Sequence, residues 1–121
     1  MQKPLLILIA GPYRSGTDGD PAAIARNLAR LEEAAGPMHR LGHIPMIGEW
    51  VALPVLRGLD ATETADGDVM YDVAARLLQH CDGVLRLPGA SAGADNDVAI
   101  ARERGLPVYF SIDDVPAASG A

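Results

Sequence analysis

Apolar residues occur along this chain in short continuous runs and in helical repeats. The run Leu5–Ala10 does not alternate with polar residues, which is typical of a strand covered on both faces in a parallel sheet. Shorter apolar runs predict three further strands, over residues 43–47, 83–87 and 107–112. Pro45 interrupts the first of these runs, so that strand is expected at an edge of the sheet, where a missing N–H is tolerated.

Between these runs, apolar residues repeat every three or four positions, as on one face of a helix. Asp20 and Pro21 predict an N-cap and the first residue of a helix, which is expected to break near Gly36-Pro37. Leu41-Gly42 predicts a helix stop before the second strand. Further helices are expected over residues 49–59, from Val69 to near Cys81-Asp82, and over 91–104, while the polar segment 60–68 predicts a mobile connection.

The alternation of strands and helices predicts an α/β fold with a parallel sheet. We expect a small Rossmann-like (flavodoxin-like) parallel sheet of four to five strands with helices on both faces, in a single domain over residues 1–121. Ligands bind such sheets at the carboxyl ends of the strands. The loops expected to carry function are therefore residues 11–19, the segment from Gly48 onward, and residues 88–97.

The composition narrows the class of protein. The formal charge is −6, from 10 Lys and Arg against 16 Asp and Glu, so no nucleic acid polymer is expected as a partner, whereas a small anion held by local groups is compatible. Five aromatic residues imply an aliphatic core, to which Tyr109 and Phe110 on the last strand should contribute. Cys81 is alone, and the run at residues 5–10 is too short for a membrane span or a signal peptide, so we expect a cytoplasmic protein.

The first motif, Gly11-Pro-Tyr-Arg-Ser-Gly-Thr17, follows the first strand. Gly11 and Gly16 have the spacing of a phosphate loop, but Thr17 stands where such a loop has Lys, which argues against an ATPase. The turn still offers backbone N–H groups and the guanidinium of Arg14, which can hold a phosphate or a sugar. Its hydroxyl groups belong to Tyr13, Ser15 and Thr17. The alternative is an ordinary solvated turn.

The second motif, Gly89-Ala-Ser-Ala-Gly93, matches the Gly-x-Ser-x-Gly elbow of serine hydrolases and lies between a strand and a helix. Those hydrolases place their histidine after the nucleophile, whereas every histidine of this chain precedes Ser91. A serine hydrolase is therefore disfavoured. A Gly/Ser turn that opens a helix explains the motif better, because free N–H groups at that point suit a phosphate.

The third motif is Asp95-Asn-Asp97, in the first turns of the same helix. An acidic residue at a helix N-terminus ordinarily contributes ~0.3 to 1 kcal/mol of stability, and this suffices to explain Asp95. Asp97 is expected to face the ligand crevice with its carboxylate kept ionised by the helix dipole. Such a carboxylate can attack or stabilise an oxocarbenium-like sugar carbon.

No metal site and no cofactor are expected. His39 and His43 are four residues apart but straddle Gly42, and the run His80-Cys-Asp82 is consecutive, so these side chains cannot converge on one point of a helix. We interpret them as surface or structural residues. For Trp50 two roles stay open, an anchor in the core or a wall on which a base stacks.

Taken together, these features resemble the nucleoside 2-deoxyribosyltransferase superfamily, which includes nucleoside monophosphate N-hydrolases. The resemblance covers roughly residues 3–112 and is strongest to an uncharacterised bacterial branch. The segments that carry it are the strand Leu5–Ala10, the motif Gly11-Pro12-Tyr13, the pattern Ser91-x-Gly93-x-x-x-Asp97 followed by Ala101, and the segment Gly42–Trp50 with its Gly-His-Ile-Pro-Met and Gly-Glu-Trp sequences.

The resemblance implies roles for individual residues. Asp97 takes the place of the carboxylate nucleophile, and Tyr13 would orient it. Phosphate contacts carry over to Arg14, Ser15 and Ser91. The remaining residues expected to contact substrate are Gly11, Gly16, Glu49, Trp50, Asp72 and Gly93. A homodimer or larger homo-oligomer is also implied.

Two departures from the family pattern bear on this interpretation. The family nucleophile is usually Glu, which is one methylene longer than Asp97. The usual base-contacting carboxylate would fall at Ala74, and Asp72 lies about 200 degrees away from that position on an ideal helix. The sequence thus favours an N-glycosidase or deoxyribosyltransferase acting on a nucleoside or nucleoside monophosphate, with Glu49 or Asp72 assisting the departing base. The alternative is a non-catalytic nucleotide-binding module.

Overall fold

The structure is a computed structural model that describes residues 3–59 and 69–118. Its four strands form one parallel sheet in the order β2-β1-β3-β4. The strands are β1 (Leu6–Ala10), β2 (Ile44–Ile47), β3 (Gly83–Arg86) and β4 (Val108–Tyr109). The helices are α1 (Pro21–Glu32), α2 (Ala35–Arg40), α3 (Gly48–Gly58), α4 (Val69–Leu78), α5 (Ala92–Glu103) and the short 3-10 helix η1 (Ile112–Asp114). The predicted Rossmann-like α/β fold is confirmed, and the predicted connection at 60–68 lies outside the described residues.

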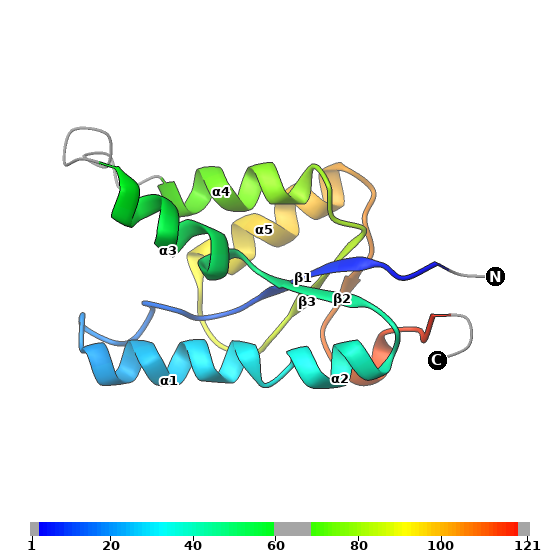
Figure 1. The fold of residues 1–121 in the computed structure, drawn as a ribbon, viewed down its shortest axis with the longest axis horizontal. Helices are drawn as coiled ribbons and strands as arrows, with labels where there is room; N and C mark the ends of the chain where they lie inside the picture. Colours follow the sequence, from blue (N-terminus) through cyan, green and yellow to red (C-terminus); the bar gives the residue numbers. More distant parts are fainter. Residues whose placement is uncertain (1–2, 60–68, 119–121) are drawn as a thin grey trace.

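Helices cover both faces of the sheet. α1 and α2 lie on one face, and α3, α4 and α5 lie on the other (Figure 1). β1 is hydrogen-bonded to β2 on one side and to β3 on the other, whereas β2 is an edge strand, as Pro45 predicts. Because all four strands are parallel, the loops that follow β1, β2 and β3 emerge at the same edge of the sheet.

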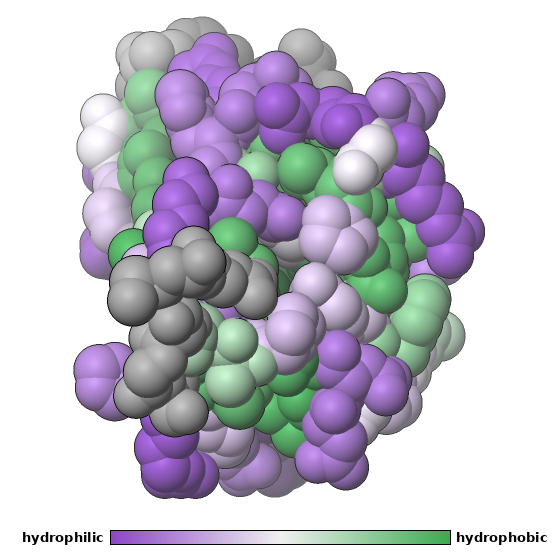
Figure 2. Space-filling model, turned by 90° about the vertical axis from the view of Figure 1, so that its right-hand side faces the viewer, coloured by the Kyte–Doolittle hydropathy of each residue, from purple (hydrophilic) through white to green (hydrophobic). Residues whose placement is uncertain are grey.

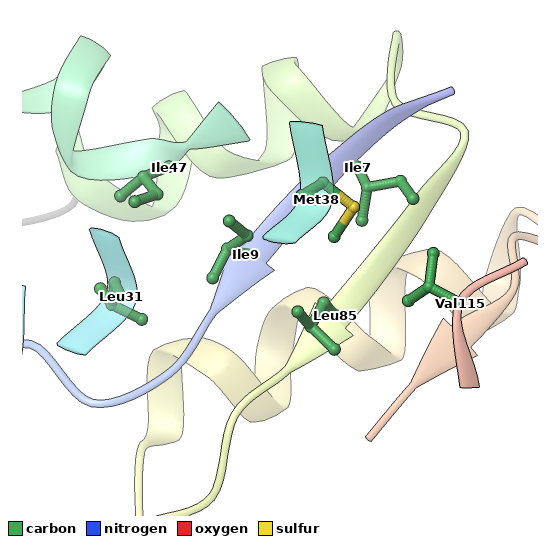
Figure 3. Close-up of a cluster of buried hydrophobic side chains, with 7 residues drawn as sticks. All are labelled: Ile7, Ile9, Leu31, Met38, Ile47, Leu85 and Val115. Carbon is green, nitrogen blue, oxygen red and sulfur yellow. The ribbon is translucent and has the colours of Figure 1, made fainter. Parts of the chain in front are cut away.

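The core is aliphatic and has one part on each face of the sheet. The cluster beneath α1 and α2 comprises Ile7, Ile9, Leu31, Met38, Ile47, Leu85 and Val115 (Figure 3). The cluster beneath α4 and α5 comprises Leu8, Ala10, Leu78, Cys81, Val84, Ala94 and Ala101. Consecutive residues of β1 therefore belong to alternate clusters, which explains why Leu5–Ala10 is apolar without alternation.

The helix boundaries follow local chemistry with one exception. The Asp20 carboxylate accepts a hydrogen bond from the N–H of Ala22 at 3.3 Å, so the predicted N-cap is confirmed. The helix break expected near Gly36-Pro37 lies a few residues earlier, because α1 ends at Glu32 and α2 begins at Ala35, with Gly36 and Pro37 in its first turn. Proline is tolerated in a first turn because its N–H would have no helical partner there.

The last strand is shorter than predicted. β4 covers only Val108–Tyr109, and the chain then turns into η1 instead of remaining extended to Ile112. Tyr109 packs against the cluster beneath α1 and α2, as expected. The core role expected for Phe110 is wrong, because 57% of its surface is exposed.

At the pole of the molecule where the strands begin, hydrogen bonds of polar side chains connect separate segments of the chain. The buried His43 accepts a hydrogen bond from the N–H of Leu5 at Nδ1 (3.0 Å), so its Nε2 carries the proton and donates to the carbonyl of Pro116 (2.5 Å). The Asp82 carboxylate accepts the N–H of Leu6 at 2.9 Å. Figure 2 shows this pole, where polar and apolar patches alternate. His43 is thus structural.

Within the described residues, no helix combines the length and the apolar character needed to cross a bilayer.

The loops after β1 and β3 contact each other at a glycine. Gly89 has φ 117°, and a Cβ atom placed on it would lie 2.7 Å from Cγ of Pro12. A side chain here would therefore be strained in backbone conformation and would also clash. The close approach of these two loops brings the segments at 11–15 and 91–97 to one side of the molecule.

Replacing Gly89 by alanine should lower the free energy of unfolding by about 1 to 3 kcal/mol, measured by urea denaturation. Gly36→Ala is the matched control, because a Cβ atom at Gly36 would meet only the Arg40 side chain, at 3.9 Å. That helical substitution should raise stability by up to about 1 kcal/mol. Equal effects of the two substitutions would contradict the close contact between the loops.

Candidate functional site

A pocket of about 260 Å³ opens at the carboxyl ends of β1, β2 and β3. This volume is near the lower end for ligand pockets and suits a small molecule. β1 supplies its floor through Leu8, Ile9 and Ala10. The walls come from the loop after β1 (Gly11, Tyr13, Arg14, Ser15), α3 (Gly48, Glu49), α4 (Met70, Tyr71, Ala74) and the start of α5 (Ser91, Gly93, Ala94, Asp97).

Hydrogen bonds stabilise the conformation of the loop after β1. The Thr17 hydroxyl donates to the carbonyl of Arg14 at 2.6 Å, so this hydroxyl is buried in the loop and does not line the pocket, contrary to its expected role in holding a ligand. Asn27 of α1 donates to the carbonyl of Tyr13 at 2.8 Å. The Arg14 guanidinium lies 5.8 Å from the centre of the Tyr13 ring. These contacts leave the side chains of Tyr13, Arg14 and Ser15 along the pocket.

The start of α5 offers hydrogen-bond donors. The Ser91 oxygen accepts the N–H of Ala94 at 3.1 Å as the N-cap of α5. Its own O–H can therefore donate to a ligand, beside the N–H groups of the first turn, which have no partner within the helix. A serine hydrolase is further disfavoured, because none of the described residues that line the pocket is a histidine that could activate Ser91.

Glu49 and Asp97 place two carboxyl groups in this one pocket. Burial and the charge of Glu49 raise the pKa of Asp97 to about 7, and the positive charge of Arg86 opposes this rise. Burial also raises the pKa of Glu49, against a hydrogen bond from its own backbone N–H. Like charges in a confined site ionise in succession, so the two carboxyls titrate as a pair. Asp97 therefore loses its proton only near pH 7, contrary to the expectation that the helix dipole keeps its carboxylate ionised.

The wall formed by α4 is mainly apolar. Met70, Tyr71 and Ala74 line the pocket, so the position where the family resemblance would place a second carboxylate carries a methyl group. Asp72 is exposed and lies outside the pocket. Of the two carboxylates expected to assist a departing base, Glu49 alone faces the pocket.

Eight of the eleven residues predicted to form the site line this pocket. They are Gly11, Tyr13, Arg14, Ser15, Glu49, Ser91, Gly93 and Asp97. Gly16, Trp50 and Asp72 do not line it. Trp50 is 39% exposed, and its Nε1–H donates to the Glu32 carboxylate at 2.9 Å on α1, so it neither anchors the core nor forms a pocket wall.

Sequence reasoning missed two features of the site. The first is Met70, which lies one helical turn before Ala74 and therefore shares its face of the helix, a spacing that could have indicated it. The second is Arg86, the last residue of β3, which forms an ion pair with Asp95 at 2.9 Å. Its positive charge favours the ionised form of Asp97. An arginine that ends an apolar strand was the available signal for Arg86.

The described part of the chain contains no group of three His, Cys, Asp or Glu side chains placed to hold a metal ion. The buried Cys81 is a free thiol whose pKa is raised to about 11, chiefly by burial, so it is protonated near neutral pH.

Comparison of the chain with known protein families gives no match, and a search among curated proteins gives none either. What the pocket can do is therefore inferred from its own residues.

The Asp97→Asn variant should become more stable relative to the wild-type protein as the pH rises. The folded-state pKa of Asp97 is about 7 against its usual 3.8, so the wild-type chain loses stability between these values as folding comes to require a buried negative charge. We expect the variant to gain about 1 to 3 kcal/mol over wild type on going from pH 4 to pH 8, allowing for solvent screening. Urea unfolding at both pH values measures this gain.

The exposed Asp72→Asn is the control for this measurement and should show no comparable change with pH. An Asp97→Asn variant whose stability relative to wild type is the same at pH 4 and pH 8 would show that Asp97 titrates normally.

Proposed function

We propose that this protein cleaves or transfers the N-glycosidic bond of a nucleoside or nucleoside monophosphate. The observation that carries the proposal is the pair of carboxyls, Glu49 and Asp97, in one pocket at the carboxyl ends of the strands. Breaking such a bond leaves positive charge on the sugar and negative charge on the base. The reaction therefore requires an anion beside the sugar carbon and a proton for the base.

The carboxyl pair can supply both when it holds one proton. In the proposed mechanism, ionised Asp97 attacks or stabilises the anomeric carbon while protonated Glu49 gives its proton to the departing base. Water, or a second base, then replaces Asp97 on the sugar, and the incoming group loses its proton to Glu49. The raised pKa values support a proton held in this pocket close to neutral pH.

The other walls of the pocket fit the rest of such a substrate. Arg14, Ser15, the Ser91 hydroxyl and the free N–H groups of α5 offer donors to a phosphate. Met70 and Tyr71 offer an apolar and aromatic surface to a base. Tyr13, which shares the pocket with Asp97, would orient its carboxylate.

This function agrees with the resemblance to the nucleoside 2-deoxyribosyltransferase superfamily, and we propose membership of that superfamily on the same grounds. A cytoplasmic location and assembly into a homodimer or larger homo-oligomer belong to the same proposal. The support is the match between the residues that carry the resemblance and the pocket: Tyr13, Ser91, Gly93 and Asp97 line it together.

One observation favours a second candidate, a nucleotide-binding module without activity. Ala74 contributes a methyl group to the pocket, and Asp97 is shorter than glutamate, which would be the signs of lost chemistry. Binding assays would not separate the candidates, because a ligand stabilises either protein by mass action. Formation of free base decides between them.

Asp97→Asn should abolish release of free base from a panel of deoxyribo- and ribonucleoside monophosphates, because an amide cannot stabilise the cationic sugar as a carboxylate does. Base release is followed by chromatography with purified protein, and circular dichroism verifies that the variant is folded. Turnover equal to wild type in the folded variant would refute the mechanism.

Glu49→Gln should lower kcat/KM by about 10²- to 10⁴-fold at pH 6, because the base would leave without its proton. In wild type, kcat/KM should fall as the pH rises through about 7, where the pair loses its last proton. This alkaline fall should be absent in Glu49→Gln, since only ionised Asp97 is then required. Asp72→Asn is the control and should retain the wild-type pH profile.

A further inference from the structure

The first turn of α3 carries Glu49 into the pocket, but little within the helix itself fixes that turn. Glu49 is the second residue of α3 and lines the pocket. No side chain caps the helix at Ile47, and Gly48, its first residue, has the greatest backbone freedom. Pro54 has no N–H, so it cannot donate the helical hydrogen bond that would reach the carbonyl of Trp50. The first turn of α3 is thus held by fewer hydrogen bonds than an ordinary helix start.

Packing anchors α3 only weakly as well. Of the residues of α3, Ala52 alone is buried, and a methyl group contributes little to the burial of apolar surface. The larger side chains of Trp50 and Val55 are exposed. The position of Glu49 therefore depends on a contact that lies outside the hydrogen bonds and the buried core of its own helix.

Trp50 makes such a contact with the opposite layer of the molecule. Its Nε1–H donates to the Glu32 carboxylate at 2.9 Å. Glu32 is the last residue of α1, which covers the other face of the sheet from α3 (Figure 1). Because α3 directly follows the edge strand β2, this bond joins the two helical layers beside the end of that strand. A hydrogen bond to a charged acceptor is stronger than one between neutral groups.

We propose that Trp50 is a positioning residue, whose hydrogen bond to Glu32 fixes the first turn of α3 and thereby holds the Glu49 carboxyl in the pocket. Consecutive residues of a helix point about 100 degrees apart, so Trp50 faces α1 while Glu49 faces the pocket. Trp50 does not line the pocket and acts only through its neighbour in the chain. Its catalytic meaning rests on the proposed function, in which Glu49 gives its proton to the departing base.

The first test is the rate of base release from the nucleoside monophosphate that the wild-type protein cleaves fastest. Trp50→Phe keeps an aromatic ring without the N–H, and Glu32→Ala removes the acceptor. Each should lower kcat about 3- to 10-fold. KM should change little, because Glu49 acts on the departing base in the transition state.

Two further substitutions separate the hydrogen bond from other effects. Glu32→Gln keeps a side-chain oxygen that can accept the indole N–H, so it should retain most of the wild-type kcat. Glu33→Ala changes the next, exposed residue and should leave kcat unchanged. A Glu32→Gln variant as slow as Glu32→Ala would overturn the proposal, and so would a rise in KM at unchanged kcat in Trp50→Phe.

A double variant tests whether Trp50 acts through Glu49. If it does, Trp50→Phe should cause no further loss of kcat in a protein that already carries Glu49→Gln, because the group to be positioned is gone. A side chain that only stabilises the fold would lower kcat in both backgrounds. The same fold loss in both backgrounds, or wild-type kcat in Glu32→Ala, would overturn the proposal. Glu32 is exposed, so Glu32→Ala serves if Trp50→Phe does not fold.

NMR spectra of the full chain without substrate give a readout that needs no activity. The chain contains a single tryptophan, so its indole N–H signal is unique and reports the bond to Glu32 directly. In Glu32→Ala this signal should shift, together with the carboxyl carbon-13 signal of Glu49, whereas neither should shift in Glu33→Ala. A Glu49 signal that stays in place in Glu32→Ala would refute the positioning role.

The spectra and the activity assay fail independently. If no nucleoside monophosphate releases its base, the proposed function falls while the spectra still report whether the bond from Trp50 holds Glu49. If base release occurs but both the Glu49 signal and kcat are unchanged in Glu32→Ala, the function stands and the role of Trp50 is refuted.

Discussion

The hydrogen bonding of β1 on both sides is the interaction on which the rest of the structure depends. β1 pairs with β2 and with β3 in parallel, and its residues contribute to the clusters on both faces of the sheet. Parallel pairing forces the loops after these three strands to one edge. The tyrosine of the first loop, the glutamate of α3 and the aspartate of α5 come from distant parts of the sequence and meet only for this reason.

Much of the fold could be predicted because its signals are local. The apolar run of β1, the Asp20-Pro21 cap and the helix stop at Leu41-Gly42 each act over a few residues, and each forms as expected. The errors arise where tertiary contacts decide. Gly36-Pro37 starts a new turn of helix instead of ending one, and Phe110 lies beyond a strand that ends after two residues. Neither outcome can be predicted from the local sequence pattern, because tertiary packing overrides intrinsic helix and strand propensity at the ends of these elements.

The site could be predicted only as far as the loops that contain it. Loop position placed Tyr13, Ser91 and Asp97 together, since each follows or begins an element at the carboxyl edge of the sheet. Side-chain direction could not be predicted in the same way. Trp50 is adjacent to Glu49, yet it turns towards Glu32 of α1. The ion pair between Arg86 and Asp95 was also hidden, because it joins the end of β3 to the first turn of α5, two segments that are separate in the sequence pattern.

Burying two carboxyls in one pocket lowers the free energy of unfolding when they are ionised, and the structure reduces this loss without cancelling it. Neutralising both groups with cations would lower their pKa values and leave no proton for a departing base. Leaving both groups unopposed would protonate both and leave no anion for the sugar. The positive charge of Arg86, which forms an ion pair with Asp95, opposes the effects of burial and of Glu49, and the pKa of Asp97 lies at about 7. The burial that makes the site costly to fold therefore also keeps a proton available in the pocket near neutral pH.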